Sequence, residues 1–232
     1  MNQRISKAPG RKALSDIDTW LFDLDNTLYS SGAAVFPQIH RRMLEFIMAE
    51  QKIGEDEAKA ERSRYFHQHG TTMRGMMVER GVDPVAFMDH VHAIDLGCLD
   101  PAPRLGAAIA RLPGRKLIFT NASARHASNV LGALGIAEHF EALFDVGDCD
   151  WLPKPDATGY RNIVAKHAFD PKRAAMIDDI PNNLRPAAAL GMTTVWVREP
   201  ADPRWKGEPD THAHVDYVTD DLVTWLEAIE AG

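Results

Sequence analysis

The sequence predicts an α/β protein with a doubly wound parallel sheet and a helical cap domain inserted after the first strand. Two observations support this prediction. Short apolar runs alternate with amphipathic, helix-length segments after residue 103, as in βαβ units. Before that alternation, residues 31–103 show only helical spacing. The expected division is a core domain of residues 1–30 and 104–232 and a cap domain of residues 31–103.

The first expected strand covers residues 17–23, a short apolar run typical of a strand buried on both faces. In the inserted segment, apolar residues recur at i, i+4, i+7 and i+8: Ile39, Met43, Phe46 and Ile47. A second cap helix is expected over residues 55–69. The residues expected to divide the rest of the insertion into short helices are Gly70, Gly75, Gly81 and Pro84.

The later alternation predicts the remaining elements of the core. Strands are expected at residues 116–120, 142–146, 174–177, 193–197 and 215–218. Helices are expected at residues 105–112, 124–134, 157–167 and 182–190, with a last one capped near Thr219 or Asp220 and ending at Ile229. Gly135 and Gly191 follow two of these helices, as glycines that end helices do.

Composition limits the class of protein. The 232 residues are 45% hydrophobic and 25% charged, which is typical of soluble globular proteins. No apolar run approaches the ~20 residues that cross a bilayer. The basic start, MNQRISKAPGRKALSD, lacks the apolar part of a secretory signal, and we expect a frayed tail there. Cys98 and Cys149 form neither a disulfide framework nor a zinc site, which favours the cytoplasm. The net charge of −7 argues against nucleic-acid binding. We expect the protein to be a monomer or a homodimer.

The first expected strand ends in two nearby acids, Asp23 and Asp25. The period-2 geometry of a strand lets both project the same way. Two carboxylates so close repel each other unless a cation lies between them or one carries a proton. The pair therefore fits a nucleophile beside a general acid and base, and it equally fits a polar turn at the end of a strand.

Three more polar motifs follow later strands. Thr120 and Asn121 come before an expected helix, where they fit a phosphate cradle or a plain N-cap. Lys154 lies between two prolines, so its ammonium is either aimed at an anion or solvated. Asp178 and Asp179 fit a site for a hard cation or an N-cap pair. Because the carboxyl ends of parallel strands meet at one crevice, the four motifs together predict a phosphate-processing site.

These motifs resemble those of a known family. FDLDNTLY, FTNAS, LPKP and MIDDIPNN are similar to motifs I to IV of the haloacid dehalogenase-like (HAD) superfamily, which has a Rossmann-like core, and the likeness spans the whole core. The segments YFHQHGTTMRGM, HVHAIDLGCLDPAPRL and FTNASARHASNVLGALGI resemble the pyrimidine 5′-nucleotidase-like branch. The insertion lies where these proteins carry a helical cap.

The resemblance implies a two-step, Mg²⁺-dependent mechanism. Asp23 attacks phosphorus to form an aspartyl-phosphate while Asp25 protonates the leaving oxygen, and Asp25 then deprotonates the hydrolytic water. Mg²⁺ would be held by the Asp23 carboxylate, the Asp25 main-chain carbonyl and Asp179, with Asp178 as a direct or water-mediated ligand. All of these donors are oxygens, which suits Mg²⁺.

The remaining motif residues receive supporting roles by the same resemblance. Thr120, the Asn121 backbone and Lys154 would bind the phosphoryl oxygens on which charge accumulates. Thr27 is expected to orient Asp25 by a hydrogen bond. Asn183 stands where many relatives have an aspartate, so a role for it in orienting Lys154 or the metal shell is in doubt.

The cap is expected to supply specificity by closing over the crevice. The candidate substrate contacts are its aromatic and polar cluster: Tyr65, His69, Thr71, Thr72 and Arg74. The same residues equally fit the core and surface of the cap. Two histidine pairs lack a third ligand at metal spacing and are expected at the surface or an interface: His90 and His92, and His212 and His214. Ser123 and His126 lack a GxSxG motif, which argues against a serine hydrolase.

The expected function is a pyrimidine nucleoside 5′-monophosphate phosphatase. The alternatives are a phosphatase or phosphotransferase for another small phosphorylated metabolite, such as phosphoglycolate or a sugar phosphate, and a non-enzymatic binding scaffold. Asp25 argues against a dehalogenase, because a halide leaving group needs no proton and an alkoxide does.

Overall fold

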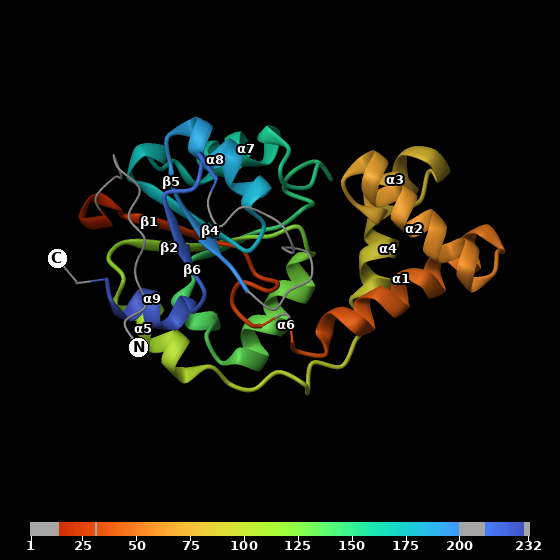
Figure 1. The fold of residues 1–232 in the computed structure, drawn as a ribbon, viewed down its shortest axis with the longest axis horizontal. Helices are drawn as coiled ribbons and strands as arrows, with labels where there is room; N and C mark the ends of the chain where they lie inside the picture. Colours follow the sequence, from red (N-terminus) through yellow and green to blue (C-terminus); the bar gives the residue numbers. More distant parts are fainter. Residues whose placement is uncertain (1–13, 31, 200–211, 230–232) are drawn as a thin grey trace.

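A six-stranded parallel sheet forms the centre of the protein, and the predicted α/β fold is confirmed (Figure 1). The computed structural model describes residues 14–30, 32–199 and 212–229, so most of the expected N-terminal tail lies outside the described residues. The strand order is β3-β2-β1-β4-β5-β6. The strands are β1 (Thr19–Phe22), β2 (Arg115–Phe119), β3 (Ala142–Phe144), β4 (Ala174–Asp178), β5 (Thr193–Val197) and β6 (Tyr217–Thr219).

The chain winds away from β1 in both directions, which places a topological switch point between β1 and β4. Phe22 of β1 is in register with Ile118 of β2 and with Ile177 of β4, so the three strands end at the same level. Segments that leave these ends emerge side by side at one edge of the sheet. In open α/β sheets, this edge is where ligands bind.

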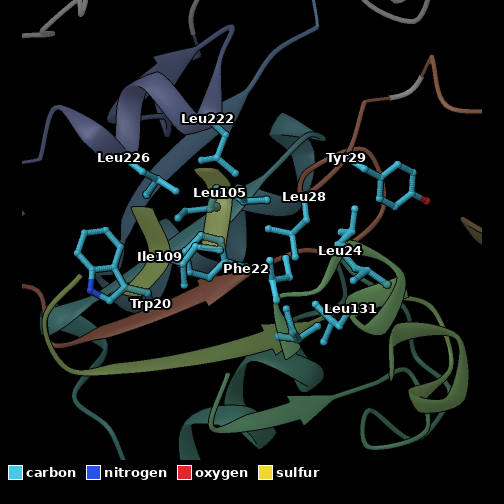
Figure 2. Close-up of a cluster of buried hydrophobic side chains, with 14 of the residues drawn as sticks. Trp20, Phe22, Leu24, Leu28, Tyr29, Leu105, Ile109, Leu131, Leu222 and Leu226 are labelled. Atoms are coloured by element: carbon cyan, nitrogen blue, oxygen red, sulfur yellow. The ribbon is translucent and has the colours of Figure 1, made fainter. Parts of the chain in front are cut away.

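Helices cover both faces of the sheet because successive strand residues point to opposite sides. The core helices are α5 (Pro103–Arg111), α6 (Ala124–Leu134), α7 (Ala157–His167), α8 (Leu184–Leu190) and α9 (Leu222–Glu227). Trp20 and Phe22 of β1 pack with apolar residues of α5, α6 and α9 (Figure 2). Leu21, between them, faces the cluster formed with α7 and α8 on the other side.

Local capping explains most helix boundaries in the core. The side chains of Ser123 and Asp156 accept hydrogen bonds from the main chain of the first turns of α6 and α7. Gly135 and Gly191 adopt left-handed conformations at the ends of α6 and α8, as predicted. The N-cap of the last helix is Asp221, whose carboxylate accepts the Thr224 N–H. It lies one or two residues after the expected position at Thr219 or Asp220. Short 3₁₀ turns occur at Leu14–Asp16, Ala137–His139, Pro171–Arg173 and Pro181–Asn183.

The inserted segment forms four helices that stand to one side of the sheet (Figure 1). They are α1 (Val35–Gln51), α2 (Glu55–His69), α3 (Thr72–Arg80) and α4 (Pro84–Val91), and they share an apolar cluster that includes Tyr65 and Phe87. The prediction that Gly75 divides helices is wrong, because it lies inside α3. A Cβ at Gly75 would overlap the Tyr65 ring, so glycine lets α2 and α3 approach each other.

The division of the chain at residues 31 and 103 stays a prediction, although α1 and α5 begin close to those positions. Within the described ranges, every helix is too short or too polar to cross a membrane.

Candidate active site

The motifs that follow four strands meet at the switch-point edge of the sheet. Asp23 directly follows β1, and its N–H donates to the Ile177 carbonyl of β4 at 2.9 Å. Thr120 follows β2, and its hydroxyl accepts the Ala122 N–H at 3.0 Å. A cavity of about 720 Å³ opens here. Among the predicted site residues of the core, those that line it are Asp23, Asp25, Thr120, Asn121 and Asp179.

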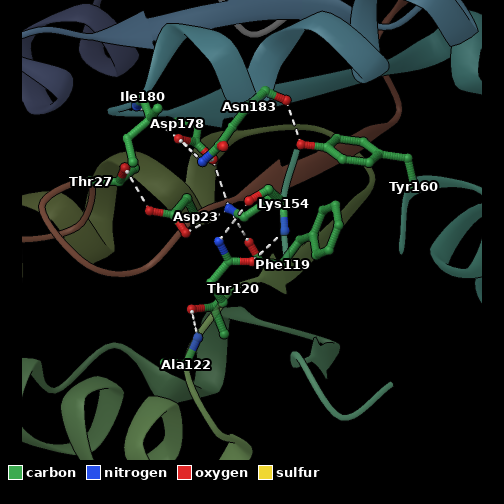
Figure 3. Close-up of polar contacts among 11 residues, drawn as sticks. Asp23, Thr27, Phe119, Thr120, Ala122, Lys154, Tyr160, Asp178, Ile180 and Asn183 are labelled. Atoms are coloured by element: carbon green, nitrogen blue, oxygen red, sulfur yellow. Dashed lines mark hydrogen bonds and ion pairs between the residues drawn. The ribbon is translucent and has the colours of Figure 1, made fainter. Parts of the chain in front are cut away.

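Lys154 lies among these motifs as a buried, fixed positive charge (Figure 3). Its Nζ donates to Asp23 Oδ1 at 2.7 Å, to Asp178 Oδ2 at 2.7 Å and to the Phe119 carbonyl at 2.9 Å. Burial alone disfavours the ammonium, but Asp178 and Asp23 outweigh it and raise the pKa of Lys154. The lysine therefore stays charged.

The Asn121 side chain holds the main chain of Lys154 in place. Its Oδ1 accepts the Lys154 N–H at 2.7 Å, and its Nδ2 donates to the Lys154 carbonyl at 3.2 Å. The side chain of Asn121 thus links the loop after β2 to the loop that carries Lys154. The predicted contact of the Asn121 backbone with a phosphoryl group stays a prediction.

Three buried carboxylates crowd together beside Lys154. One oxygen each from Asp23, Asp178 and Asp179 lies within 4.8 Å of the others. Burial raises the pKa of Asp23, and Asp178 and Asp179 raise it further against the opposing charge of Lys154. Three carboxylates against one ammonium leave excess negative charge in a low-dielectric site. This all-oxygen donor set fits a hard divalent cation such as Mg²⁺.

Asp178 is already occupied by protein donors. Its Oδ1 accepts the Ile180 N–H at 2.8 Å, and Asn183 Nδ2 donates to both carboxylate oxygens at 3.0 and 3.2 Å. Asn183 in turn accepts the Tyr160 hydroxyl at its main-chain carbonyl. Asn183 therefore holds Asp178, which contacts Lys154, while a role for Asn183 in orienting Lys154 or the metal shell is not tested by these contacts.

The Asp25 carboxylate has partners of its own. The Tyr29 hydroxyl donates to Asp25 Oδ1 at 2.6 Å, and His126 Nε2 lies 3.1 Å from the same oxygen. Burial raises the pKa of Asp25, but these contacts with His126 and Tyr29 outweigh it, and the pKa lies below its ordinary value. The carboxylates that crowd Asp23 are those of Asp178 and Asp179, and the prediction that a cation or a proton separates Asp23 from Asp25 stays a prediction.

A tight turn gives the two acids different hydrogen-bond partners. Asn26 adopts a left-handed conformation with φ of 62°, and the Leu28 N–H donates to the Leu24 carbonyl at 3.0 Å. The turn brings residues four apart together. The prediction that Thr27 orients Asp25 is therefore wrong, because the Thr27 hydroxyl donates to Asp23 Oδ2 at 3.3 Å. Asp25 lies outside the three-carboxylate cluster, and metal binding by its main-chain carbonyl stays a prediction.

His126 and His92 are site residues that the sequence interpretation missed. His126 is 1% exposed in the first turn of α6. The His92 ring, expected at a surface or interface, stacks on His126 with centroids 4.2 Å apart and lines the cavity. Burial, and to a lesser degree His126, lower the pKa of His92 to about 3, so this ring is neutral. The sequence contained one signal for His126. It lies three residues after Ser123, which caps a helix that follows a strand, and the start of such a helix lies at the edge of the sheet that carries the site.

The cap side of the cavity differs from the predicted substrate contacts. Thr72 lines the cavity, and so does Thr71, whereas Tyr65, His69 and Arg74 are absent from the described lining. Tyr65 is fully buried in the cap, and its hydroxyl accepts Gln51 Nε2 at 2.9 Å. His69 Nε2 lies 2.7 Å from Glu79 Oε1.

The residues of α2 that do line the cavity are Arg62, Ser63 and Phe66. Consecutive helix residues point about 100° apart, so the burial of Tyr65 in the cap turns Phe66 toward the cavity. Phe66 is 61% exposed. Phe36 and Met43 of α1 add apolar surface to the same wall.

Comparisons with known proteins identify relatives of the chain. The family model for haloacid dehalogenase-like hydrolases matches residues 17–191. Phosphate metabolism protein 8 of Saccharomyces cerevisiae is 26% identical over 190 residues, which cover 75% of this chain and 59% of the yeast protein. Enolase-phosphatase E1 of Frankia alni is 36% identical over 64 residues, or 28% of this chain and 26% of that protein. The chain thus spans less than two thirds of the length of both relatives.

Solved structures share the fold. A HAD phosphatase from Thermococcus onnurineus matches with a TM-score of 0.63 at 16% identity, covering 91% of this chain and 97% of that one. A 2-haloacid dehalogenase from Pseudomonas syringae pv. Tomato matches with a TM-score of 0.57 at 18% identity, with coverage of 91% and 97%. Phosphatases and dehalogenases both appear among these neighbours, so the reaction has to be argued from the side chains of the site.

Proposed function

We propose, from the premise that this chain belongs to the haloacid dehalogenase-like hydrolase family, that it is a Mg²⁺-dependent phosphomonoester hydrolase with Asp23 as its nucleophile. One observation carries the proposal: the two acids that follow β1 have different surroundings. Asp23 lies with two further carboxylates and Lys154, whereas Asp25 is bound by two hydrogen-bonding groups. The first setting suits a nucleophile beside a bound cation, and the second fixes the orientation of a carboxylate, as a general acid and base requires.

A cation fits the first setting. Asp23 and Asp179 would bind Mg²⁺, with Asp178 close by and largely engaged by Lys154, Ile180 and Asn183. When bound, Mg²⁺ would neutralise the crowded carboxylates and the charge of the phosphoryl group. Both the cation and Lys154 favour the ionised form of Asp23, against the burial that raises its pKa.

The side chains then divide the reaction between them. An Asp23 oxygen bonds to phosphorus as the ester P–O bond breaks, and the leaving oxygen takes a proton from Asp25. Asp25 next takes a proton from water, whose oxygen bonds to phosphorus as the bond to Asp23 breaks. Thr120 lines the cavity beside Asp23, where its hydroxyl can contact a phosphoryl oxygen. The halide that leaves a haloacid needs no proton, whereas the alkoxide that leaves a phosphate ester does. The presence of Asp25 therefore favours phosphate esters as substrates.

For the substrate we propose a pyrimidine nucleoside 5′-monophosphate. The cavity volume falls within the range of small-molecule sites. Phe36 and Phe66 provide aromatic surface for a flat ring, and Arg62 and Ser63 provide hydrogen-bonding groups on the same wall. These residues replace Tyr65 and Arg74 as the candidate contacts with the base.

The test is phosphate release from a metabolite panel with and without Mg²⁺. UMP and CMP are expected to be hydrolysed faster than phosphoglycolate and sugar phosphates, and only with the metal. Asp23→Asn is expected to fall to below about one thousandth of the wild-type rate, because it removes the nucleophile. Asp220→Asn, which changes a partly exposed acid paired with Arg198, serves as the control and keeps full activity.

Each result has a distinct meaning. Fast turnover of sugar phosphates without turnover of nucleotides contradicts the substrate and leaves the mechanism standing. Full activity in EDTA, or in Asp23→Asn, contradicts the mechanism itself. With excess sugar present as acceptor, a phosphorylated sugar in place of free phosphate identifies a phosphotransferase.

A further inference from the structure

The hydrogen bonds of the Asp25 carboxylate are concentrated on one of its two oxygens. Tyr29 and His126 both contact Oδ1, at 2.6 and 3.1 Å. Within the described part of the chain, no hydrogen bond reaches Oδ2. The Asp25 side chain is 18% exposed and lines the cavity. One oxygen is therefore held by the protein, and the other is left to face the substrate.

We propose that His126 and Tyr29 are positioning residues for Asp25. They fix Oδ1, so that Oδ2 is the atom that gives a proton to the leaving group and later takes one from water. This inference rests on the proposed function, because it requires Asp25 to act as general acid and base.

Two donors on one oxygen have a clear geometric effect. The torsion that rotates a carboxylate about its Cβ–Cγ bond has broad minima, so an unrestrained Asp25 could turn either oxygen toward the cavity. Productive proton transfer requires alignment to within roughly 10–20°. The phenol of Tyr29, four residues along the same turn, and the imidazole of His126, 101 residues away, approach Oδ1 from different elements and oppose that rotation.

His92 braces His126 from the cap. It follows the last residue of α4, and its ring stacks on His126 with an interplanar angle of 19°. His92 Nδ1 also lies 3.0 Å from the hydroxyl of Ser123, the residue that caps α6 and accepts the His126 N–H. The alignment of Asp25 in the core therefore depends on a side chain from the inserted segment.

The same junction contains an ion pair between the two helices. Arg125 of α6 and Asp89 of α4 approach to 3.3 Å, although both side chains are largely exposed. The pair adds little energy by itself, since exposed pairs contribute about 0–1 kcal/mol. It shows that the end of α4 and the start of α6 lie close together, next to the stacked rings of His92 and His126.

The proton that Oδ2 delivers matters most for poor leaving groups. When Asp23 displaces an alkoxide, the departing oxygen needs the proton as the P–O bond breaks. A nitrophenolate leaves readily without one. Misalignment of Asp25 should therefore slow the first step with alkyl phosphates far more than with p-nitrophenyl phosphate.

The experiment compares kcat/KM for UMP or another alkyl phosphate with kcat/KM for p-nitrophenyl phosphate, both with Mg²⁺. The parameter kcat/KM reports the steps up to phosphorylation of Asp23. Hydrolysis of the aspartyl-phosphate, which both esters share, therefore does not mask the difference. For His126→Leu we expect a loss of about 100-fold with the alkyl ester and less than about tenfold with the aryl ester. His126→Gln, whose amide can donate from a similar position, should recover most of the loss. Tyr29→Phe should also lower kcat/KM for the alkyl ester more than for the aryl ester, as His126→Leu does.

A matched control is His139→Leu, which removes a partly buried imidazole beyond the far end of α6 and should leave both values unchanged. Equal losses with both esters in His126→Leu and Tyr29→Phe overturn the proposal, and so does a Gln variant no better than the Leu variant. If His126→Leu does not fold, Tyr29→Phe decides, because it removes a single hydroxyl. A wild-type protein inactive on both esters contradicts the proposed function and the inference together, whereas an active wild type with uniform losses contradicts the inference alone.

Discussion

Lys154 contacts two carboxylates and a carbonyl oxygen, and all of these contacts are buried. A buried ion pair adds little net stability, because desolvation offsets most of its Coulomb energy. Removing one partner is costly, since the other charges are then buried without compensation. Lys154 therefore has two effects that can be separated: it offsets the repulsion between Asp23 and Asp178 in the resting protein, and it supplies positive charge for a phosphoryl group.

Lys154→Met should lower the free energy of unfolding by roughly 3–5 kcal/mol without added metal, because Asp23 and Asp178 lose their shared cation. Adding Asp178→Asn should restore part of that stability, since it removes one of the uncompensated charges. Neither variant should release phosphate at a measurable rate. Urea unfolding curves and phosphate assays test both statements, and a stable, active Lys154→Met protein contradicts them.

The crossing of α2 and α3 is set by one small residue. Gly75 lies where a Cβ would overlap Tyr65, and Tyr65 accepts a hydrogen bond from Gln51 of α1. Three helices of the cap thus depend on one close contact. Arg64 and Glu79 add a partly exposed ion pair across the same two helices at 2.7 Å. The position of this crossing also determines which side of α2 faces the cavity.

Gly75→Ala should lower the free energy of unfolding by about 1–3 kcal/mol, because the added methyl group overpacks the contact with Tyr65. Gly132→Ala is the matched control. It is an exposed position inside α6 with no atom within 4 Å of an added Cβ, and it should gain about 0.5–1 kcal/mol from helix propensity. Chemical denaturation of the two variants measures the difference, and equal stabilities would show that the crossing tolerates a methyl group.

At the scale of the whole molecule, the site is assembled from distant parts of the chain. The switch between β1 and β4 brings three strand ends together, and the cap adds apolar surface above them. The charge that gathers there is unbalanced, with three carboxylates around one lysine. A cation that binds only this folded arrangement should therefore stabilise the protein as a whole.

Mg²⁺ at about 100 times its dissociation constant should add roughly 2.7 kcal/mol to the stability, which corresponds to a rise in Tm of about 5–10 °C for a chain of this size. EDTA should reverse the rise. Asp179→Asn should abolish it, while Asp220→Asn should keep it. A thermal shift assay measures all three, and a Tm that does not respond to Mg²⁺ in the wild type contradicts a metal site in this cluster.

Sequence patterns determined the elements of this protein because their causes are local. The predicted helices at residues 55–69, 124–134 and 157–167 coincide with α2, α6 and α7, since capping side chains and terminal glycines act within one turn. The order of the four motifs also determined which edge of the sheet carries the site. Parallel strands must end together, so residues that directly follow them must converge.

Only the tertiary structure decided how those residues pair. Asp25 is held by Tyr29, on the other side of the turn at Asn26, and by His126, a partner 101 residues distant. Tyr65 is buried and Phe66 faces the cavity because a helix face is chosen by packing, which periodicity alone does not specify for two adjacent aromatic residues. Local physics sets where an element begins and ends, whereas the direction and partner of a side chain depend on elements that meet only once the chain is folded.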